Sequence, residues 1–398
     1  MIIKYMSNIE IRIGVIGNVD SGKSTLVSVL SKKLLDDGRG KARKLVLKHP
    51  HEKDTGRTSD VTQTHLIKDK GYITFIDLAG HERYLKTTLK GLTGGYIDYV
   101  LLVIGANMGV SMMTKEHISI AYALQIPIII VVTKMDLSND HVLKKTNEDI
   151  NKLVTRFKFK NIRIISDDNK DNKLNFKKVL PLFYVSNKTG KNINLLRDYL
   201  INLKPKLNWN KEDKKIFSID EKYNVTGVGI VLSGKVRSGT INKGDKLFLG
   251  PFYGKWELVT IKSIHDNFRN VVDYLEAGTS GCIAIKGINK KAVIKKNRLR
   301  KGVILVEKRN ISSRFNADVI ILRSHSNNIK LNYQPVINCK TVCQSAEIVE
   351  MKKKYLKGGE KSNVEFKFLF YPEHIVKDDI FLFRDGRTKG IGRILEVK

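Results

Sequence analysis

Cysteine, proline and tryptophan are scarce in this sequence. Its 398 residues include three cysteines, seven prolines and two tryptophans. Cys339 and Cys343 are spaced CxxxC with no second pair nearby, and Cys282 stands alone. Such spacing provides neither a disulfide framework nor a zinc-binding motif. A disulfide-stapled secreted scaffold is therefore excluded, and we expect a reducing compartment, the cytoplasm.

Long hydrophobic runs are also missing. The longest, 99–106 and 126–132, have the length of a strand and are too short to cross a bilayer. The apolar segment near the start is interrupted by Glu10 and Arg12, so it lacks the pattern of a signal peptide. We expect a soluble protein that has no membrane partner, and a monomer is the default expectation.

Acidic residues are in the minority. Lysine and arginine total 72 against 40 aspartates and glutamates, which gives a formal net charge of +32. A surplus of this size favours polyanionic partners, through phosphate contacts and counterion release. A compositional bias toward lysine is the alternative explanation. The charge therefore indicates contact with nucleic acid without specifying which one.

The pattern of the chain changes near residue 210. Before it, apolar runs at 11–17, 72–78, 99–106 and 126–134 alternate with helical stretches, which predicts a mostly parallel sheet covered on both faces. From Ile216 onward, short strands alternate with glycine-rich turns, a pattern typical of barrels. A second break falls near 307–316. We therefore predict an α/β domain and two small all-β barrel domains, with the boundaries 1–207, 215–307 and 311–398.

A glycine-rich loop follows the first predicted strand. Its sequence, GNVDSGKST, fits the pattern GxxxxGK[ST]. Glycines let successive backbone N–H groups surround phosphate oxygens, and the N-terminus of the following helix adds its dipole. Lys23 would reach the β- and γ-phosphates, and the Ser24 hydroxyl would bind Mg²⁺. The predicted phosphate-binding residues are Gly17, Asn18, Val19, Asp20, Ser21, Gly22, Lys23, Ser24 and Thr25.

A second motif, TKMD, follows a buried strand and identifies the base. Asp136 can accept hydrogen bonds from the ring N–H and the exocyclic amine of guanine together, whereas adenine lacks both donors at that position. The stem of Lys134 can lie over the base, and Thr133 belongs to the same motif. Ser186 and Asn187 follow the next predicted strand. These four strand-end positions and Asp136 predict a site for GTP or GDP.

A third motif, DLAGH, follows another predicted strand and carries the chemistry. Asp77 would hold Mg²⁺ through water, and the Gly80 N–H would touch the γ-phosphate. Thr58, in a polar loop between the first helix and this strand, can complete the metal shell. His81 is then placed to orient the attacking water, where small signalling GTPases commonly have Gln. A surface histidine after a turn is the alternative. We predict GTP hydrolysis, with Lys23, Thr58, Gly80 and His81 as catalytic residues.

These motifs resemble those of the translational GTPases, the group of elongation factor Tu and elongation factor 1-alpha. GNVDSGKST is similar to their phosphate loop and DLAGH to their DxPGH motif, with Ala79 in place of proline. The segments 36–43, 51–61 and 185–196 are similar to the branch of GTP-binding protein 1 and GTP-binding protein 2. The resemblance implies a P-loop GTPase domain followed by two β-barrel domains.

The resemblance also implies partners. It suggests a factor that binds aminoacyl-tRNA or other RNA and acts at the ribosome, in elongation or in resolving stalled ribosomes. It implies that Asp20 helps to hold a monovalent cation near the phosphates, and that Thr133, which replaces Asn, loses one contact with guanine. No arginine finger is evident, so we expect slow intrinsic hydrolysis.

Two other functions fit the same fold. One is a GTP-dependent RNA-binding regulatory module in RNA turnover, against which His81 argues. The other is a GTPase subunit of a non-translational complex, a role that gives no reason for the net charge of +32.

Overall fold

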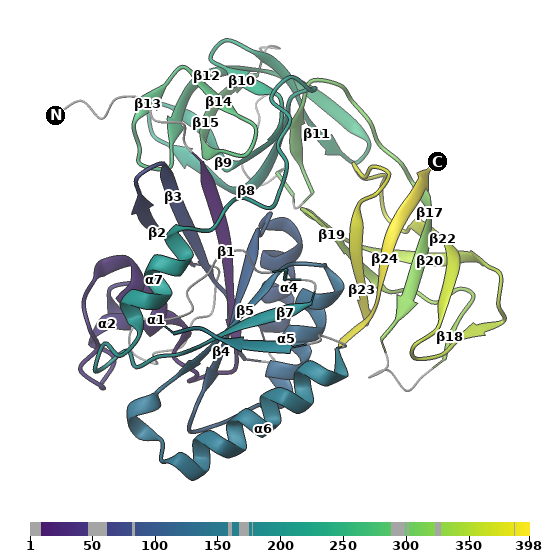
Figure 1. Ribbon diagram of the computed structural model, residues 1–398. Helices are drawn as coiled ribbons and strands as arrows, with labels where there is room; N and C mark the ends of the chain where they lie inside the picture. Colours follow the sequence, from purple (N-terminus) through teal and green to yellow (C-terminus); the bar gives the residue numbers. More distant parts are fainter. Residues whose placement is uncertain are drawn as a thin grey trace. The chain divides into compact units, whose positions relative to one another are not determined.

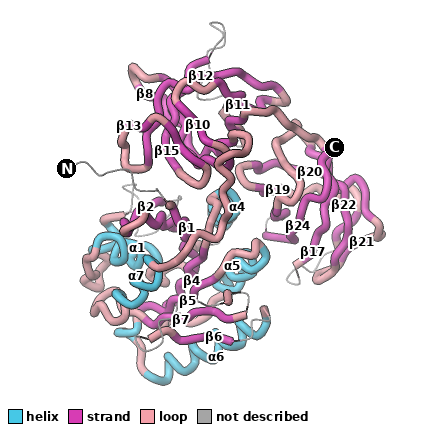
Figure 2. The backbone as a smooth tube through the Cα atoms, turned by 45° about the horizontal axis from the view of Figure 1, so that its top comes forward, coloured by secondary structure: helices cyan, strands magenta, loops and turns pink. Residues whose placement is uncertain are grey.

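The computed structural model describes residues 9–46, 62–81, 84–157, 161–166, 175–176, 178–287, 299–300, 302–322, 328–385 and 387–398. The chain divides into two compact units, Met1–Lys206 and Leu207–Lys398 (Figure 1). The first unit combines helices and strands, whereas the described residues of the second contain strands and loops only (Figure 2). The three domain boundaries drawn from the sequence remain a prediction.

A seven-stranded sheet forms the centre of the first unit. Its order is β2-β3-β1-β4-β5-β7-β6, and all neighbours are parallel except β2 and β3. Every residue of β1, β4 and β5 is buried, as expected for strands covered on both faces. The strands are β1 Glu10–Gly17, β2 Thr62–Lys68, β3 Gly71–Asp77, β4 Tyr99–Gly105, β5 Ile128–Thr133, β6 Asn161–Ile164 and β7 Val179–Tyr184.

Helices lie on both faces of this sheet. α1 and α7 pack against the face that carries Ile11, Ile13 and Val15, and α4 and α5 lie on the other (Figure 1). Ser111 and Asn139 cap α5 and α6, because their side-chain oxygens accept the N–H groups of Thr114 and Val142. The helices are α1 Lys23–Lys32, α2 Lys41–Lys44, α4 Leu85–Gly94, α5 Met112–Ala123, α6 Asp140–Arg156, α7 Ile193–Ile201 and the 3₁₀ helix η2 Met135–Leu137.

The first half of the second unit is a barrel. Its antiparallel strands run β11-β16-β8-β9-β15-β12, and pairing between β11 and β12 closes the circle. The core includes Phe217, Leu232 and Leu249, all fully buried. The strands are β8 Ile216–Val225, β9 Gly229–Ser238, β10 Thr240–Asn242, β11 Lys246–Phe252, β12 Lys255–Asp266, β13 Val271–Val272, β14 Tyr274–Glu276, β15 Ser280–Gly287 and β16 Ile304–Val306.

The second half is another closed barrel, in the order β17-β22-β20-β19-β23-β24. Aromatic rings fill its core: Phe315 stacks on Phe366 with centroids 5.3 Å apart and meets Phe381 edge-on with centroids 5.4 Å apart. An α/β domain followed by two β-barrels is thus confirmed. The strands are β17 Arg314–Ile321, β18 Ile329–Lys330, β19 Val336–Cys339, β20 Val342–Met351, β21 Tyr355–Leu356, β22 Lys361–Phe368, β23 Ile380–Asp385 and β24 Arg387–Val397.

Both tryptophans of the chain belong to the second unit. Trp256 lies in β12, and Trp209 precedes β8. The ammonium group of the fully buried Lys235 lies 5.0 Å from the centre of the Trp209 ring, a cation–π contact. No helix in the described part of the chain combines the length and apolarity needed to cross a membrane.

Candidate nucleotide-binding site

The phosphate loop, residues 17–25, connects β1 to α1. It turns through two left-handed positions, Asp20 at φ 57° and Gly22 at φ 87°. The Ser21 hydroxyl donates to the Asn18 carbonyl at 2.9 Å. A Cβ at Gly17 would lie only 2.1 Å from the Val103 carbonyl oxygen of β4, so this strand end requires glycine. The loop is therefore held in a tight curve above the carboxyl end of the sheet.

Lys23 is buried beneath this loop. Its ammonium group donates to the carbonyls of Gly17 and Asn18 at 3.2 and 2.6 Å. Burial lowers the pKa of Lys23 to about 8, an effect that the nearby carboxylates of Asp77 and Asp20 oppose. Anionic phosphate oxygens would favour the charged form of Lys23 further.

Ser24 and Asp77 bring two hard oxygen ligands together. The Ser24 hydroxyl donates to Asp77 Oδ2 at 2.5 Å, joining the start of α1 to the end of β3. A hydroxyl and a carboxylate fit Mg²⁺, which takes few protein oxygens together with water and phosphate. No group of three or more His, Cys, Asp or Glu side chains able to hold a metal occurs among the described residues. Thr58, the third predicted metal ligand, lies outside them.

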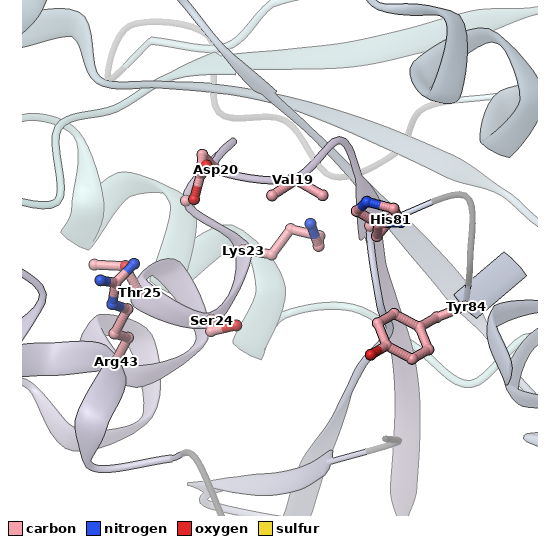
Figure 3. A pocket seen from close by; sticks show the side chains of 10 residues that line it. Val19, Asp20, Lys23, Ser24, Thr25, Arg43, His81 and Tyr84 are labelled. Carbon is pink, nitrogen blue, oxygen red and sulfur yellow. The ribbon is translucent and has the colours of Figure 1, made fainter. Parts of the chain in front are cut away.

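The DLAGH turn, residues 77–81, passes directly over the phosphate loop. A Cβ at Gly80 would lie 2.4 Å from Lys23 Nζ and 2.6 Å from the Gly17 carbonyl oxygen, so a side chain cannot be accommodated there. His81 is exposed, and its ring centre lies 6.2 Å from that of Tyr84. Two motifs that are far apart in the sequence thus share one pocket (Figure 3). Its lining consists of Val19, Asp20, Gly22, Lys23, Ser24, Thr25, Arg43, Gly80, His81 and Tyr84.

The predicted guanine-binding residues lie at the ends of β5 and β7. The Ser186 hydroxyl donates to Asp136 Oδ1 at 2.5 Å, which holds that carboxylate in place. Thr133 Oγ1 donates to the Ser21 carbonyl at 2.6 Å and so ties this motif to the phosphate loop. Lys134 takes a left-handed backbone conformation, at φ 61°. Asn187 lies close to the phosphate loop, since a Cβ at Gly22 would lie 3.5 Å from its Nδ2.

His117 is a residue of the site that the sequence analysis missed. It lies on α5, is fully buried, and its Nδ1 accepts the Gly17 N–H at 3.2 Å. Burial lowers the pKa of His117 to about 3, and the charge of Lys23 adds to this effect. The ring is therefore neutral at physiological pH and anchors the first residue of the phosphate loop. Arg43, which also lines the pocket, was likewise not predicted.

Acid is expected to destabilise the protein through His117. The unfolded chain takes up a proton on this ring below its ordinary pKa of 6.5, whereas the folded chain does so only near 3, so stability falls as the pH drops through this window. From about pH 7 to about pH 4.5 the wild type should lose about 2 to 3 kcal/mol more than His117→Asn. Urea titrations followed by far-UV circular dichroism measure this difference.

Asparagine is the matched variant because its Oδ1 can replace Nδ1 as the acceptor without titrating. His117→Phe, which leaves the buried Gly17 N–H without that acceptor, should cost about 1 to 3 kcal/mol at neutral pH. Parallel pH profiles for wild type and His117→Asn would contradict the assignment.

Comparison with known proteins identifies the family. The family described as Elongation factor Tu GTP binding domain matches residues 9–206. GTP-binding protein 1 of Xenopus laevis is 37% identical over 424 residues, covering 98% of this chain and 64% of that protein. GTP-binding protein 2 of Mus musculus is 34% identical over 428 residues, covering 98% of this chain and 70% of that protein. The chain thus spans about two thirds of the length of these relatives.

Solved structures share the fold at lower identity. A bacterial selenocysteine-specific elongation factor superposes with a TM-score of 0.77 at 19% identity, over 98% of this chain and 59% of that one. The elongation factor SelB of Methanococcus maripaludis, in complex with a GTP analogue, gives 0.74 at 21%, over 99% and 80%. The Ski7 GTPase-like domain of S. cerevisiae, bound to GTP, gives 0.77 at 14%, over 97% of each chain. These structures show the fold, and the family match together with the curated relatives shows that the chain belongs to the elongation factor Tu type of GTPases, in the group of GTP-binding protein 1 and GTP-binding protein 2.

Proposed function

We propose that this protein binds GTP in the pocket between the phosphate loop and the DLAGH turn and hydrolyses it to GDP and phosphate. The observation that carries the proposal is the convergence of Lys23, the Ser24–Asp77 pair, Gly80 and His81 on one pocket. Family membership supports it. In this proposal Asp136 and Ser186 select guanine, and Asp20, which lines the pocket, helps to hold a monovalent cation.

Each residue has a defined part in hydrolysis. Water attacks the γ-phosphorus, the bond to the β–γ bridging oxygen breaks, and GDP, phosphate and a proton are released. Lys23 and the Gly80 N–H stabilise the charge on the transferred group, and His81 orients the water. Mg²⁺, held by Ser24, Asp77 and Thr58, would supply further charge compensation.

The proposed site of action is the ribosome, with aminoacyl-tRNA or another RNA as the ligand. The two barrels follow the GTPase domain, two of the solved structures that share this fold are named as elongation factors, and the net charge of +32 suits an RNA partner. We infer that hydrolysis is slow in the free protein and is triggered on the ribosome, in elongation or in resolving stalled complexes, and that the protein acts as a cytoplasmic monomer.

Single-turnover GTP hydrolysis tests this proposal. Ribosomes that carry aminoacyl-tRNA should raise the rate by about 10³-fold or more, the scale on which GTPases respond to activating partners. Poly(U) at the same phosphate concentration is the control for simple charge attraction and should have little effect.

Equal stimulation by poly(U) and by ribosomes would favour an RNA-binding module that acts in RNA turnover. No stimulation by any ribosomal complex, with normal GTP binding, would leave a GTPase and remove its role in translation.

A further inference from the structure

The segment DDGRGKAR, residues 36–43, forms a loop that runs into the short helix α2 and is held by its own two carboxylates. Asp36 accepts the N–H groups of Gly38 and Ala42 at 3.0 and 2.9 Å. Asp37 Oδ1 accepts the N–H groups of Arg39 and Lys41 at 2.8 and 3.1 Å. The bonds to Lys41 and Arg39 lower the pKa of Asp37. The acidic side chains are used to shape the loop, and the basic ones remain for other contacts.

The loop is fastened to the segment proposed to bind guanine. The Asp36 N–H donates to the Asn187 carbonyl at 2.9 Å. A Cβ at Gly38 would lie 3.5 Å from the side chain of Lys188, and one at Gly190 would lie 3.3 Å from Leu35. The position of the loop is therefore set by the segment around Asn187, a residue proposed to bind guanine.

Arg43 is the basic residue that this loop directs to the phosphate pocket. It is half-buried and lines the pocket with Ser24 and Thr25. A Cβ at Gly40 would lie 2.5 Å from Arg43 Nε, so the guanidinium passes over a position that only glycine leaves open. Among the described residues, no carboxylate forms an ion pair with Arg43. Arg39, in the same loop, is exposed and does not line the pocket.

The position of Arg43 within the pocket shows which phosphates it can reach. Arg43 and Thr25 lie at one end and His81 at the other, with Lys23 between them (Figure 3). In this type of loop the lysine reaches the β- and γ-phosphates, and backbone N–H groups surround the α- and β-phosphates. Because His81 is proposed to orient the water that attacks the γ-phosphorus, the end of the pocket that carries it would hold the γ-phosphate. The opposite end, which carries Thr25 and Arg43, would then face the α- and β-phosphates.

We propose that Arg43 binds the α- and β-phosphate oxygens of the guanine nucleotide. The planar guanidinium can donate two parallel hydrogen bonds to phosphate oxygens, which adds charge and geometry to the binding. Because these phosphates are common to GTP and GDP, Arg43 strengthens the binding of both nucleotides and takes no part in cleavage. The proposal rests on the proposed nucleotide site and adds to it a binding residue that none of its three motifs contains.

Equilibrium binding of fluorescent mant-GTP and mant-GDP tests this role. Arg43→Ala should weaken both nucleotides by about 10- to 100-fold, the effect of losing hydrogen bonds between charged groups. Arg39→Ala removes the same side chain from the same loop outside the pocket, and should change neither affinity by more than about 2-fold. Arg43→Lys keeps the positive charge but lacks the planar guanidinium, so it should give an intermediate loss of affinity. It also provides the test if Arg43→Ala does not fold.

Three results would overturn the proposal. The first is an unchanged affinity for both nucleotides in Arg43→Ala and Arg43→Lys. The second is a loss for mant-GTP alone, which would place the contact at the γ-phosphate. The third is an unchanged nucleotide affinity in Arg43→Ala together with a single-turnover rate at saturating GTP that is about 10³-fold lower than that of the wild type. That result is expected of an arginine finger. Failure of the wild type itself to bind mant-GTP would instead reject the proposed nucleotide site.

Discussion

An Asp136→Asn variant is expected to lose GTP binding and to gain binding of xanthosine triphosphate. The Asp136 carboxylate can accept two hydrogen bonds from guanine, whereas an amide offers one acceptor and one donor. Xanthine carries a carbonyl where guanine carries the exocyclic amine, so the amide matches it. A site built around such hydrogen bonds rejects the mismatched base by about 10⁴-fold. The change in base preference is measured by letting GTP and xanthosine triphosphate each compete with mant-GDP and with mant-labelled xanthosine diphosphate.

Ser186→Ala provides the matched control for Asp136→Asn. It removes the hydroxyl that donates to Asp136 Oδ1 and leaves the carboxylate itself. Affinity for GTP should fall by about 10-fold, since one positioning hydrogen bond is lost, while the preference for guanine remains. If Asp136→Asn retained GTP and did not accept the xanthine nucleotide, guanine would have to be selected by other residues.

A His81→Ala variant is expected to bind GTP normally and to lose about 10²- to 10⁴-fold in the single-turnover rate, the usual contribution of a group that handles a proton or a nucleophilic water. His81 lies at the exposed edge of the pocket, whereas Lys23 and Gly80 form its floor. Truncating the ring should therefore leave nucleotide affinity within about 3-fold. Rates at saturating GTP, measured with and without ribosomes, separate binding from chemistry.

His81→Gln distinguishes the orientation of water from a purely structural role. Glutamine can still donate to and accept from water, so it should recover part of the rate that alanine loses. Equal rates for wild type and His81→Ala would show that His81 is a surface residue and that another group orients the water. A large loss of GTP affinity in His81→Ala would assign it to binding instead.

Local patterns in the sequence were sufficient for the architecture. A short apolar run such as 99–106, rich in Val and Ile, favours a strand buried on both faces of a sheet, and the glycine-rich turns after Ile216 do not favour helices. The phosphate loop was equally visible, because the close approach at Gly17 leaves no room for another residue type. The antiparallel strand β2 was not predicted at all, because its sequence, TQTHLIK, contains no continuous apolar run.

Contacts between distant residues could not be predicted in the same way. His117 accepts a hydrogen bond from Gly17, which is 100 positions away in the sequence, and its helix offers only an ordinary buried position. Thr133 was expected to lose a contact with guanine, and its hydroxyl bonds to the Ser21 carbonyl in the structure. Arg43 belongs to a segment noticed for its family resemblance alone. A role that depends on a partner elsewhere in the chain leaves no local pattern.

The location of both tryptophans allows one optical signal to be recorded from each unit. Trp209 and Trp256 lie in the second unit, so intrinsic tryptophan emission comes from the barrels. A mant-labelled nucleotide emits from the other unit. Heating the complex while recording both colours would therefore show whether the GTPase domain and the barrels melt together or separately, with no label introduced into the chain.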